Sequence, residues 1–239
     1  MTSSRERWLA LRSAAWLSAA VHLAAGLAML LVLGTGLETN EDAAARLRFL
    51  VEGRAAWTAG WLVWHAAALS MLWFAVCFAR APAEGESSAA GGLPRFALAL
   101  ATAAIALDLG AQAIELGLTP PLAAEVRAAE ERSNPAARAA AWTAFQRAHR
   151  AAMLLTGYAA NGIYTIASLA LAWSGRRRYP AWTSAAALLV GAGGIALSAA
   201  VLTDRVAGMF WSNVVLLPGI LLWQVGVAVA AGRFAGARR

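Results

Sequence analysis

Three polar side chains stand at helical spacing inside one long apolar segment of this chain. Asp108, Gln112 and Glu115 occupy positions i, i+4 and i+7 within residues 96–118. At about 100° per residue these positions lie within about 60° of one another on a helix, so they share one face. A charged side chain at the centre of a bilayer costs on the order of 2.5–3.5 kcal/mol on insertion scales, so such a face must turn toward protein or water. The spacing predicts a buried polar face able to bind a proton or a cation.

Other polar residues fall at a similar depth in neighbouring apolar segments. At about 1.5 Å per residue, Asp108 lies about 18 Å from the inner end of its segment, His65 and Asn161 about 15 Å from the outer ends of theirs, and His22 about 12 Å from the inner end. Groups from four helices should therefore meet near mid-depth, with Asn213 nearer the outer surface. We expect an outward-opening polar cavity whose candidate ligand-binding residues are His22, His65, Asp108, Gln112, Glu115, Tyr158 and Asn161.

Each of these residues also has a purely structural interpretation. The acidic face could be an interhelical clamp that pairs with Arg147 or Arg150, because buried ion pairs often serve packing alone. The two mid-depth histidines could be neutral rings that hydrogen-bond across helices. His149, between those two arginines, is expected near the outer interface, solvated or bound to lipid headgroups.

Metal and haem sites are less favoured alternatives at the same place. His22, His65 and Asp108 could ligate a metal ion, but paired spacings such as HxxxH or ExxH are absent. Haem held by the two histidines has only those two isolated residues in its favour. No cofactor is favoured, and no catalytic residue is assigned.

The composition places the chain in the membrane class. Hydrophobic residues make up 60% of its 239 positions, charged residues 14%, and the mean hydropathy is +0.58. Soluble domains carry about 45–50% apolar and about 25% charged residues, so a soluble globular domain is excluded. The net charge is +7, and all 20 basic residues are arginines scattered between apolar segments. They serve membrane topology rather than nucleic-acid binding.

Six apolar segments are long enough to cross a bilayer, which takes about 20 residues in a helix. The predicted fold is an all-α, polytopic bundle of six transmembrane helices in one integral membrane domain, residues 1–239. The predicted spans are 14–33, 55–78, 96–118, 151–173, 181–203 and 208–231.

The arginine distribution predicts the orientation. One side, which holds both termini and the loops 79–95 and 174–180, carries 11 arginines against three acids, whereas the other side carries nine against eight. Arg176–Arg178 lie in a very short loop, where the positive-inside bias acts most strongly. Both termini are therefore expected in the cytoplasm of a bacterial inner membrane.

Two outer segments are predicted to be short amphipathic helices. Residues 41–53 alternate apolar and charged positions at helical spacing, with Asn40 as the expected N-cap. Residues 121–132 are similar. The Asn134–Pro135 pair should end that helix and begin another that runs directly into the fourth span.

The motif content leaves several function classes open. The sequence lacks a GxSxG elbow, a glycine-rich phosphate loop and a CxxC pair, so it indicates no particular enzymatic reaction. The best hypothesis is binding of a small lipophilic or cationic ligand, or a proton, in the polar cavity. The alternative is a non-catalytic module or subunit that stabilises a partner complex, with homo- or hetero-oligomeric contacts through small-residue helix faces. A small transporter is a weaker alternative, because no internal repeat is convincing.

The second half of the chain carries a loose pattern of motifs. A basic turn, Ser174-Gly175-Arg176-Arg177-Arg178-Tyr179-Pro180-Ala181-Trp182, is followed by a glycine-rich span and a last span with Asn213, Pro218 and Trp223. Residues 150–231 thereby resemble a family of uncharacterised six-helix bacterial membrane proteins, a domain of unknown function. The resemblance implies six helices in a bacterial inner membrane and no activity or site residues.

Overall fold

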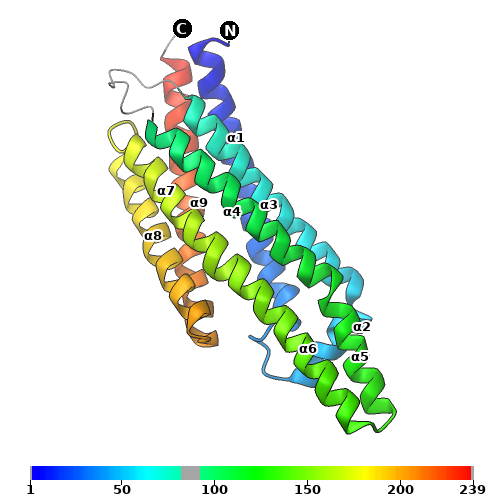
Figure 1. The fold of residues 1–239 in the computed structure, drawn as a ribbon. Coiled ribbons are helices and arrows are strands. Elements are labelled where there is room, and N and C mark those ends of the chain that lie inside the picture. Colours follow the sequence, from blue (N-terminus) through cyan, green and yellow to red (C-terminus); the bar gives the residue numbers. More distant parts are fainter. Residues whose placement is uncertain (1, 82–91, 238–239) are drawn as a thin grey trace.

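The computed structural model describes residues 2–81 and 92–237 and shows an all-α, polytopic bundle (Figure 1). Six of its helices are long and apolar enough to cross a membrane, and each contains most of one predicted span. Residues 82–91 of the predicted loop 79–95 and the last two arginines lie outside the described residues. The spanning helices are α1 (Ser4–Leu31), α3 (Arg54–Arg80), α4 (Gly92–Gly117), α8 (Ala181–Leu202), α9 (Val206–Gly236) and, as the fourth in chain order, α7 (Asn161–Gly175) together with the helical residues that lead into it from Pro135.

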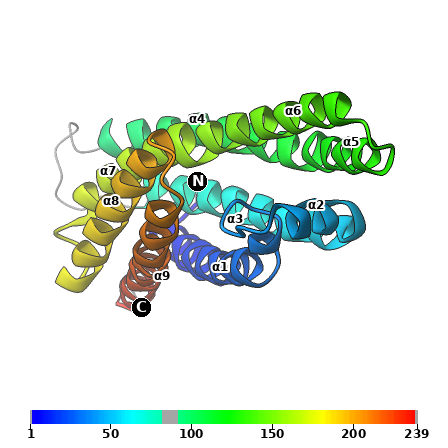
Figure 2. The ribbon, with the colours of Figure 1, turned by 90° about the horizontal axis from the view of Figure 1, so that it is seen from below.

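The six spanning helices form a ring in chain order. Each packs against the next one along the chain, and α9 closes the ring against α1. Figure 2, which looks along the bundle, shows this circuit. Both termini lie at the same end, here called the termini side (Figure 1). A ring of this kind gives every spanning helix one face toward a shared centre.

The opposite end carries three further helices, here called the extension: α2 (Ala43–Glu52), α5 (Thr119–Glu131) and α6 (Pro135–Met153). The α4–α5 segment is 40 residues long, and the segment from α6 through α7 is 41 residues long. At 1.5 Å per residue the latter is about 60 Å long, roughly twice the hydrocarbon core of about 30 Å. The α5–α6 hairpin therefore projects well beyond the spanning part of the bundle, and α2 packs against α5 (Figure 1).

Local capping chemistry sets the starts of the extension helices. Asn134 accepts a hydrogen bond from the amide of Ala137 at 3.0 Å, and Pro135 follows it as the first helical residue. The expected continuation into the fourth span is confirmed. The predicted cap at Asn40 is wrong, because Asp42 caps α2. Asn40 instead accepts from the Asp42 amide at 3.1 Å, which closes a turn just before the helix.

Small residues let α7 and α8 approach closely. Asn161 on α7 donates to the backbone oxygen of Gly194 on α8 at 2.7 Å and to the hydroxyl of Ser198 at 2.9 Å. A Cβ atom at Gly194 would collide with the hydroxyl of Thr165. Close contact between small residues is a common way for helices to associate in lipid. This small-residue face is therefore occupied within the chain itself.

Two of the three apolar clusters in the described residues lie at opposite ends of the bundle. The termini-side cluster gathers around the buried Phe74, Phe78 and Trp223. The extension-side cluster gathers around Trp57 and Phe145. The polar side chains predicted to do chemistry lie between these clusters or beside the second one.

Candidate functional site

A pocket of about 140 Å³ lies at the centre of the ring, here called the central pocket. All six spanning helices contribute to its wall, as does the π-helical segment η3 (Leu154–Ala160) that precedes α7. Its polar lining residues are His22, Asp108, Thr156, Asn161, Tyr164, Thr165, Ser168 and Asn213. Its larger apolar lining residues are Trp64, Met71, Val190, Leu197, Leu216, Leu217 and Ile220. The pocket is thus amphipathic.

The structure brings three of the seven predicted site residues to this pocket, namely His22, Asp108 and Asn161. The other four lie elsewhere. The His65 ring nitrogen Nδ1 lies 3.0 Å from the Trp61 backbone oxygen, and Tyr158 is 44% exposed. Gln112 and Glu115 are buried on the predicted face of α4, farther toward the extension.

Asp108 is the only carboxylate among the residues that line the central pocket. Its side chain is buried and accepts a hydrogen bond from Thr156 Oγ1 at 2.5 Å. The arginines proposed as clamp partners do not reach it: Arg150 pairs with Asp204 at 3.0 Å, and Arg147 is exposed. Within the described chain Asp108 therefore forms no salt bridge with an arginine.

The hydrogen bonds of His22 determine which of its ring nitrogens carries a proton. Its Nδ1 lies 2.8 Å from the backbone oxygen of Ser18, which can only accept, so Nδ1 carries a proton. Ser18 is also joined to Ser70 on α3 at 3.2 Å and to Gln224 on α9 at 2.8 Å. This network fixes the ring on the termini side of the pocket. In the neutral ring Nε2 is then the acceptor.

The Tyr164 hydroxyl is a second group with hydrogen-bonding capacity to spare. It is buried and finds no partner among the described residues, although Tyr164 lines the pocket. A buried hydroxyl without a partner costs roughly 1–3 kcal/mol. A molecule in the pocket that accepts from or donates to this hydroxyl would remove that cost.

A π-helical segment and a proline-containing stretch of α9 both border the central pocket. Thr156 and Gly157 belong to the π-helical segment, a feature frequent at functional sites. Pro218 lies inside α9, where it has no N–H to donate to the backbone oxygen four residues earlier. Its neighbours Leu217 and Ile220 line the pocket. The π-helical segment and the missing backbone donor at Pro218 thus lie beside the hollow.

A second polar group lies beside the extension and was not anticipated as a unit. His149 Nδ1 lies 2.7 Å from Glu115 Oε1, and its Nε2 contacts Glu38 Oε2. Carboxylates only accept hydrogen bonds, so both ring nitrogens donate and the ring is an imidazolium. The expectation of a solvated His149 is wrong, because its side chain is only 8% exposed.

Arg46 on α2 completes this charged cluster, defined as Glu38, Arg46, Glu115 and His149. Burial lowers the pKa of Arg46, and the negative charges of Glu38 and Glu115 oppose that effect. Burial alone would raise the pKa of Glu38, but the hydrogen bond and charge of His149 outweigh it and hold the pKa below its ordinary value. Two positive and two negative groups leave the cluster neutral.

Helix continuity, which the sequence did predict, explains the cluster. The helix begins at Pro135 and carries His149 back toward α4, while Glu38 follows the short 3₁₀ turn η1 (Leu33–Thr35) after α1. His149 is 34 positions from Glu115 and 111 positions from Glu38 along the sequence. Local spacing does not encode such pairings. The only sequence signal was the Glu115 position on the polar face.

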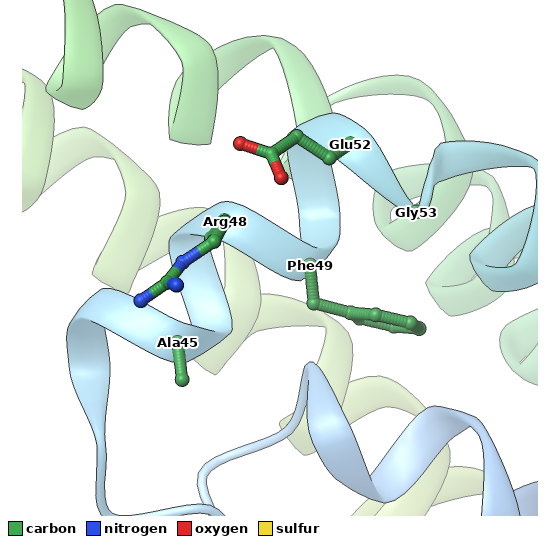
Figure 3. A pocket seen from close by; sticks show the side chains of 5 residues that line it. All are labelled: Ala45, Arg48, Phe49, Glu52 and Gly53. Atoms are coloured by element: carbon green, nitrogen blue, oxygen red, sulfur yellow. The ribbon is translucent and has the colours of Figure 1, made fainter.

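In the part of the chain that the structure describes, no metal cluster competes with the central pocket. In residues 2–81 and 92–237, no three His, Cys, Asp or Glu side chains are arranged to hold a metal ion. A larger but open hollow of about 330 Å³ lies on α2. Figure 3 shows its lining residues, all from α2 and the next residue: Ala45, Arg48, Phe49, Glu52 and Gly53. It has one wall, and its Glu52 already pairs with Arg127 at 2.7 Å.

Comparisons of this chain with protein-family models, with curated proteins and with solved structures found no match. The resemblance of residues 150–231 to a bacterial membrane family therefore remains a prediction. The function must be argued from the geometry of the site.

Proposed function

We propose that this multi-pass membrane protein binds a small amphiphile in the central pocket, with the cationic or hydrogen-bond-donating head of the ligand at Asp108. The observation that carries the proposal is a single buried carboxylate in a pocket with a largely apolar lining. Asp108 and Thr156 line the pocket together with leucine, isoleucine and valine side chains of α8 and α9. An apolar body with one polar end fits such a lining.

The volume sets the size of the ligand. An engineered protein cavity of about 150 Å³ accommodates benzene. The central pocket, at about 140 Å³, suits an apolar body of that size. A buried carboxylate is costly without a partner, and a cationic head would supply one. The Tyr164 hydroxyl and the His22 acceptor nitrogen offer further contacts. These features favour a ligand over a purely structural role for the polar residues.

We further propose the bacterial inner membrane as the location, with both termini cytoplasmic and the extension on the outer side. The arginine-rich loops on the termini side support this orientation through the positive-inside bias. The resemblance of the second half of the chain supports the bacterial membrane.

Benzylamine, benzyl alcohol and toluene provide a direct test, because they share a ring and differ in the head group. Binding is measured by calorimetry with the protein in lipid nanodiscs. We expect the order benzylamine, benzyl alcohol, toluene from tightest to weakest. Asp108→Asn should weaken benzylamine about tenfold or more, because a hydrogen bond to a charged group contributes about 1.5–3 kcal/mol. Asn can still accept from Thr156, so this variant should remain folded.

A matched pair of leucine variants on α8 controls for partition into lipid. Leu197→Phe fills the pocket and should weaken all three ligands, whereas Leu188→Phe, at a position 68% exposed on the bundle surface, should not. Equal benzylamine binding by wild type and Leu197→Phe would overturn the proposal. It would favour the alternative of a non-catalytic membrane module.

A further inference from the structure

The polar face of α4 runs from the central pocket to the charged cluster. Asp108 lines the pocket, and Glu115 binds His149 at the other end. The two carboxylates are seven residues apart, about 10 Å along the helix axis. Gln112 lies between them on the same face and is fully buried.

Exposure falls from Glu38 to Glu115 along the first part of this route. The side chain of Glu38 is 21% exposed, that of His149 8% and that of Glu115 2%. Glu38 therefore meets solvent at the extension, and His149 and Glu115 are successively more deeply enclosed. Acids and a histidine in hydrogen-bond contact form the usual structure of a proton relay within a membrane protein.

The segment between Glu115 and Asp108 contains buried polar atoms without partners. Both polar atoms of the Gln112 amide, the Glu115 Oε2 atom and the Trp61 indole N–H form no hydrogen bond of good geometry within the described residues, although the Gln112 amide lies near enough to Asp108 to interact with it. Trp57, one turn before Trp61 on α3, donates to the Glu115 backbone oxygen at 2.9 Å, so Trp61 lies level with Gln112 in the antiparallel pair. Buried polar groups of this kind are normally satisfied by ordered water.

We propose that this face of α4 is a proton path that connects the extension side with Asp108 through water held at Gln112. The inference deepens the proposed function and rests on it in one respect: protonation of Asp108 would release a cationic head from the pocket. The other charged and titratable groups that face the path are Arg46 on α2, His65 on α3, and His22 and Tyr164 across the pocket.

The transfer balances without any further reactant. A proton from water adds to the Glu38 carboxylate. His149 passes its Nδ1 proton to Glu115 and keeps its Nε2 proton. The neutral ring then turns over, and the vacated nitrogen takes the proton of Glu38. After its carboxyl group rotates, Glu115 gives the proton to a water at Gln112, which gives one of its own to Asp108. One proton has then moved from the extension side to Asp108, and all intermediate groups have returned to their initial states.

The test uses diisopropylcarbodiimide, a small apolar reagent that adds to protonated carboxyl groups. The protein is placed in liposomes in one orientation, and the pH is set independently on the two sides. The rate of Asp108 modification is followed by mass spectrometry of its peptide. We expect this rate to follow the pH on the extension side, changing up to about tenfold per pH unit while the carboxylate is mostly ionised.

Gln112→Leu and Glu115→Gln interrupt the path, and Gln146→Leu, an exposed glutamine on α6, is the matched control. Both path variants should lose the dependence on extension-side pH, and the control should keep it. Gln112→Leu removes unpartnered polar atoms, so it should fold. A Gln112→Leu protein with the full dependence would overturn the proposal, as would a wild-type rate that follows the termini side. An Asp108 that never reacts contradicts it too. Because no benzylamine is used, failure here is separate from failure of ligand binding.

Discussion

His149 on α6 donates from Nδ1 to Glu115 Oε1 on α4 over 2.7 Å, within the charged cluster that also includes Glu38 and Arg46. This contact joins the projecting hairpin to a spanning helix at a point with almost no access to solvent. It also places a positive charge at the end of the polar face of α4. The partner of Glu115 is therefore a histidine, and neither an arginine nor a lipid headgroup is needed to pair with it.

His149→Gln should destabilise the protein strongly. The substitution leaves two carboxylates without their cation, and loss of one partner of a buried ion pair costs about 3–5 kcal/mol. Chemical unfolding in detergent measures the change. Arg147→Gln, two residues earlier on the exposed face of α6, should change stability little.

A double-mutant cycle separates this pairing from a general effect on the helix. His149→Gln combined with Glu115→Gln removes both charges, so the double variant should lose much less than the sum of the two single losses. Additive losses would mean that the two side chains do not stabilise each other.

Acidification should weaken the same cluster through Glu38. Its pKa is lowered in the folded protein, so its contribution to stability is complete above the ordinary value of 4.5 and is lost as the pH falls through the lowered pKa. The free energy of unfolding of wild type should therefore decrease over this acidic window. Glu38→Gln should be less stable at neutral pH and show a shallower decrease.

Glu41→Gln is the control for that comparison, because Glu41 is exposed and forms no ion pair within the described chain. It should reproduce the wild-type pH dependence. Identical pH dependence in Glu38→Gln and wild type would show that His149 does not hold Glu38 in its ionised form.

The sequence predicted the helices far better than it predicted their contacts. Apolar length located all six spanning helices, and spacing placed Asp108 and Glu115 on one buried face of α4, as the structure has them. These are local properties of one helix. The partners of those carboxylates are Thr156 and His149, which lie 48 and 34 positions away. No periodicity within one segment reports such distances.

Only part of the predicted site came together, because the prediction used depth along each helix axis. The depth estimate placed His22, Asp108 and Asn161 at the level of the central pocket, which they line. Depth alone does not give rotation about the helix axis. His65 is close enough to interact electrostatically with Asp108, yet its ring nitrogen Nδ1 is bonded to its own helix and it does not line the pocket.

Gly194→Ala tests the close approach of α7 and α8. The added methyl group would collide with Thr165, and overpacking of this kind costs about 1–3 kcal/mol. Gly110→Ala on α4 is the matched control, because its Cβ would meet nothing within 4 Å. Thermal unfolding should show a loss for the first and no loss for the second. Equal melting temperatures would contradict the packing of this helix pair.

Cysteine labelling tests the proposed orientation. The native Cys77 is buried, so it gives a low background. Glu131→Cys at the end of α5 should react with a membrane-impermeant maleimide added outside intact cells. Ala237→Cys, just after α9, should react only after the membrane is opened. The reverse pattern would place the termini outside.

Protection of Asp108 by a bound ligand is a direct test of the proposed binding site. The rate at which diisopropylcarbodiimide modifies Asp108 is measured with and without saturating benzylamine, and Glu125, an exposed acid on α5, serves as the internal reference. A benzylammonium head at Asp108 keeps the carboxylate ionised and fills the central pocket. We therefore predict that benzylamine slows the Asp108 reaction by about tenfold or more, in line with the strength of a charged hydrogen bond, and leaves Glu125 unchanged. An Asp108 rate that is the same with and without benzylamine would contradict the account.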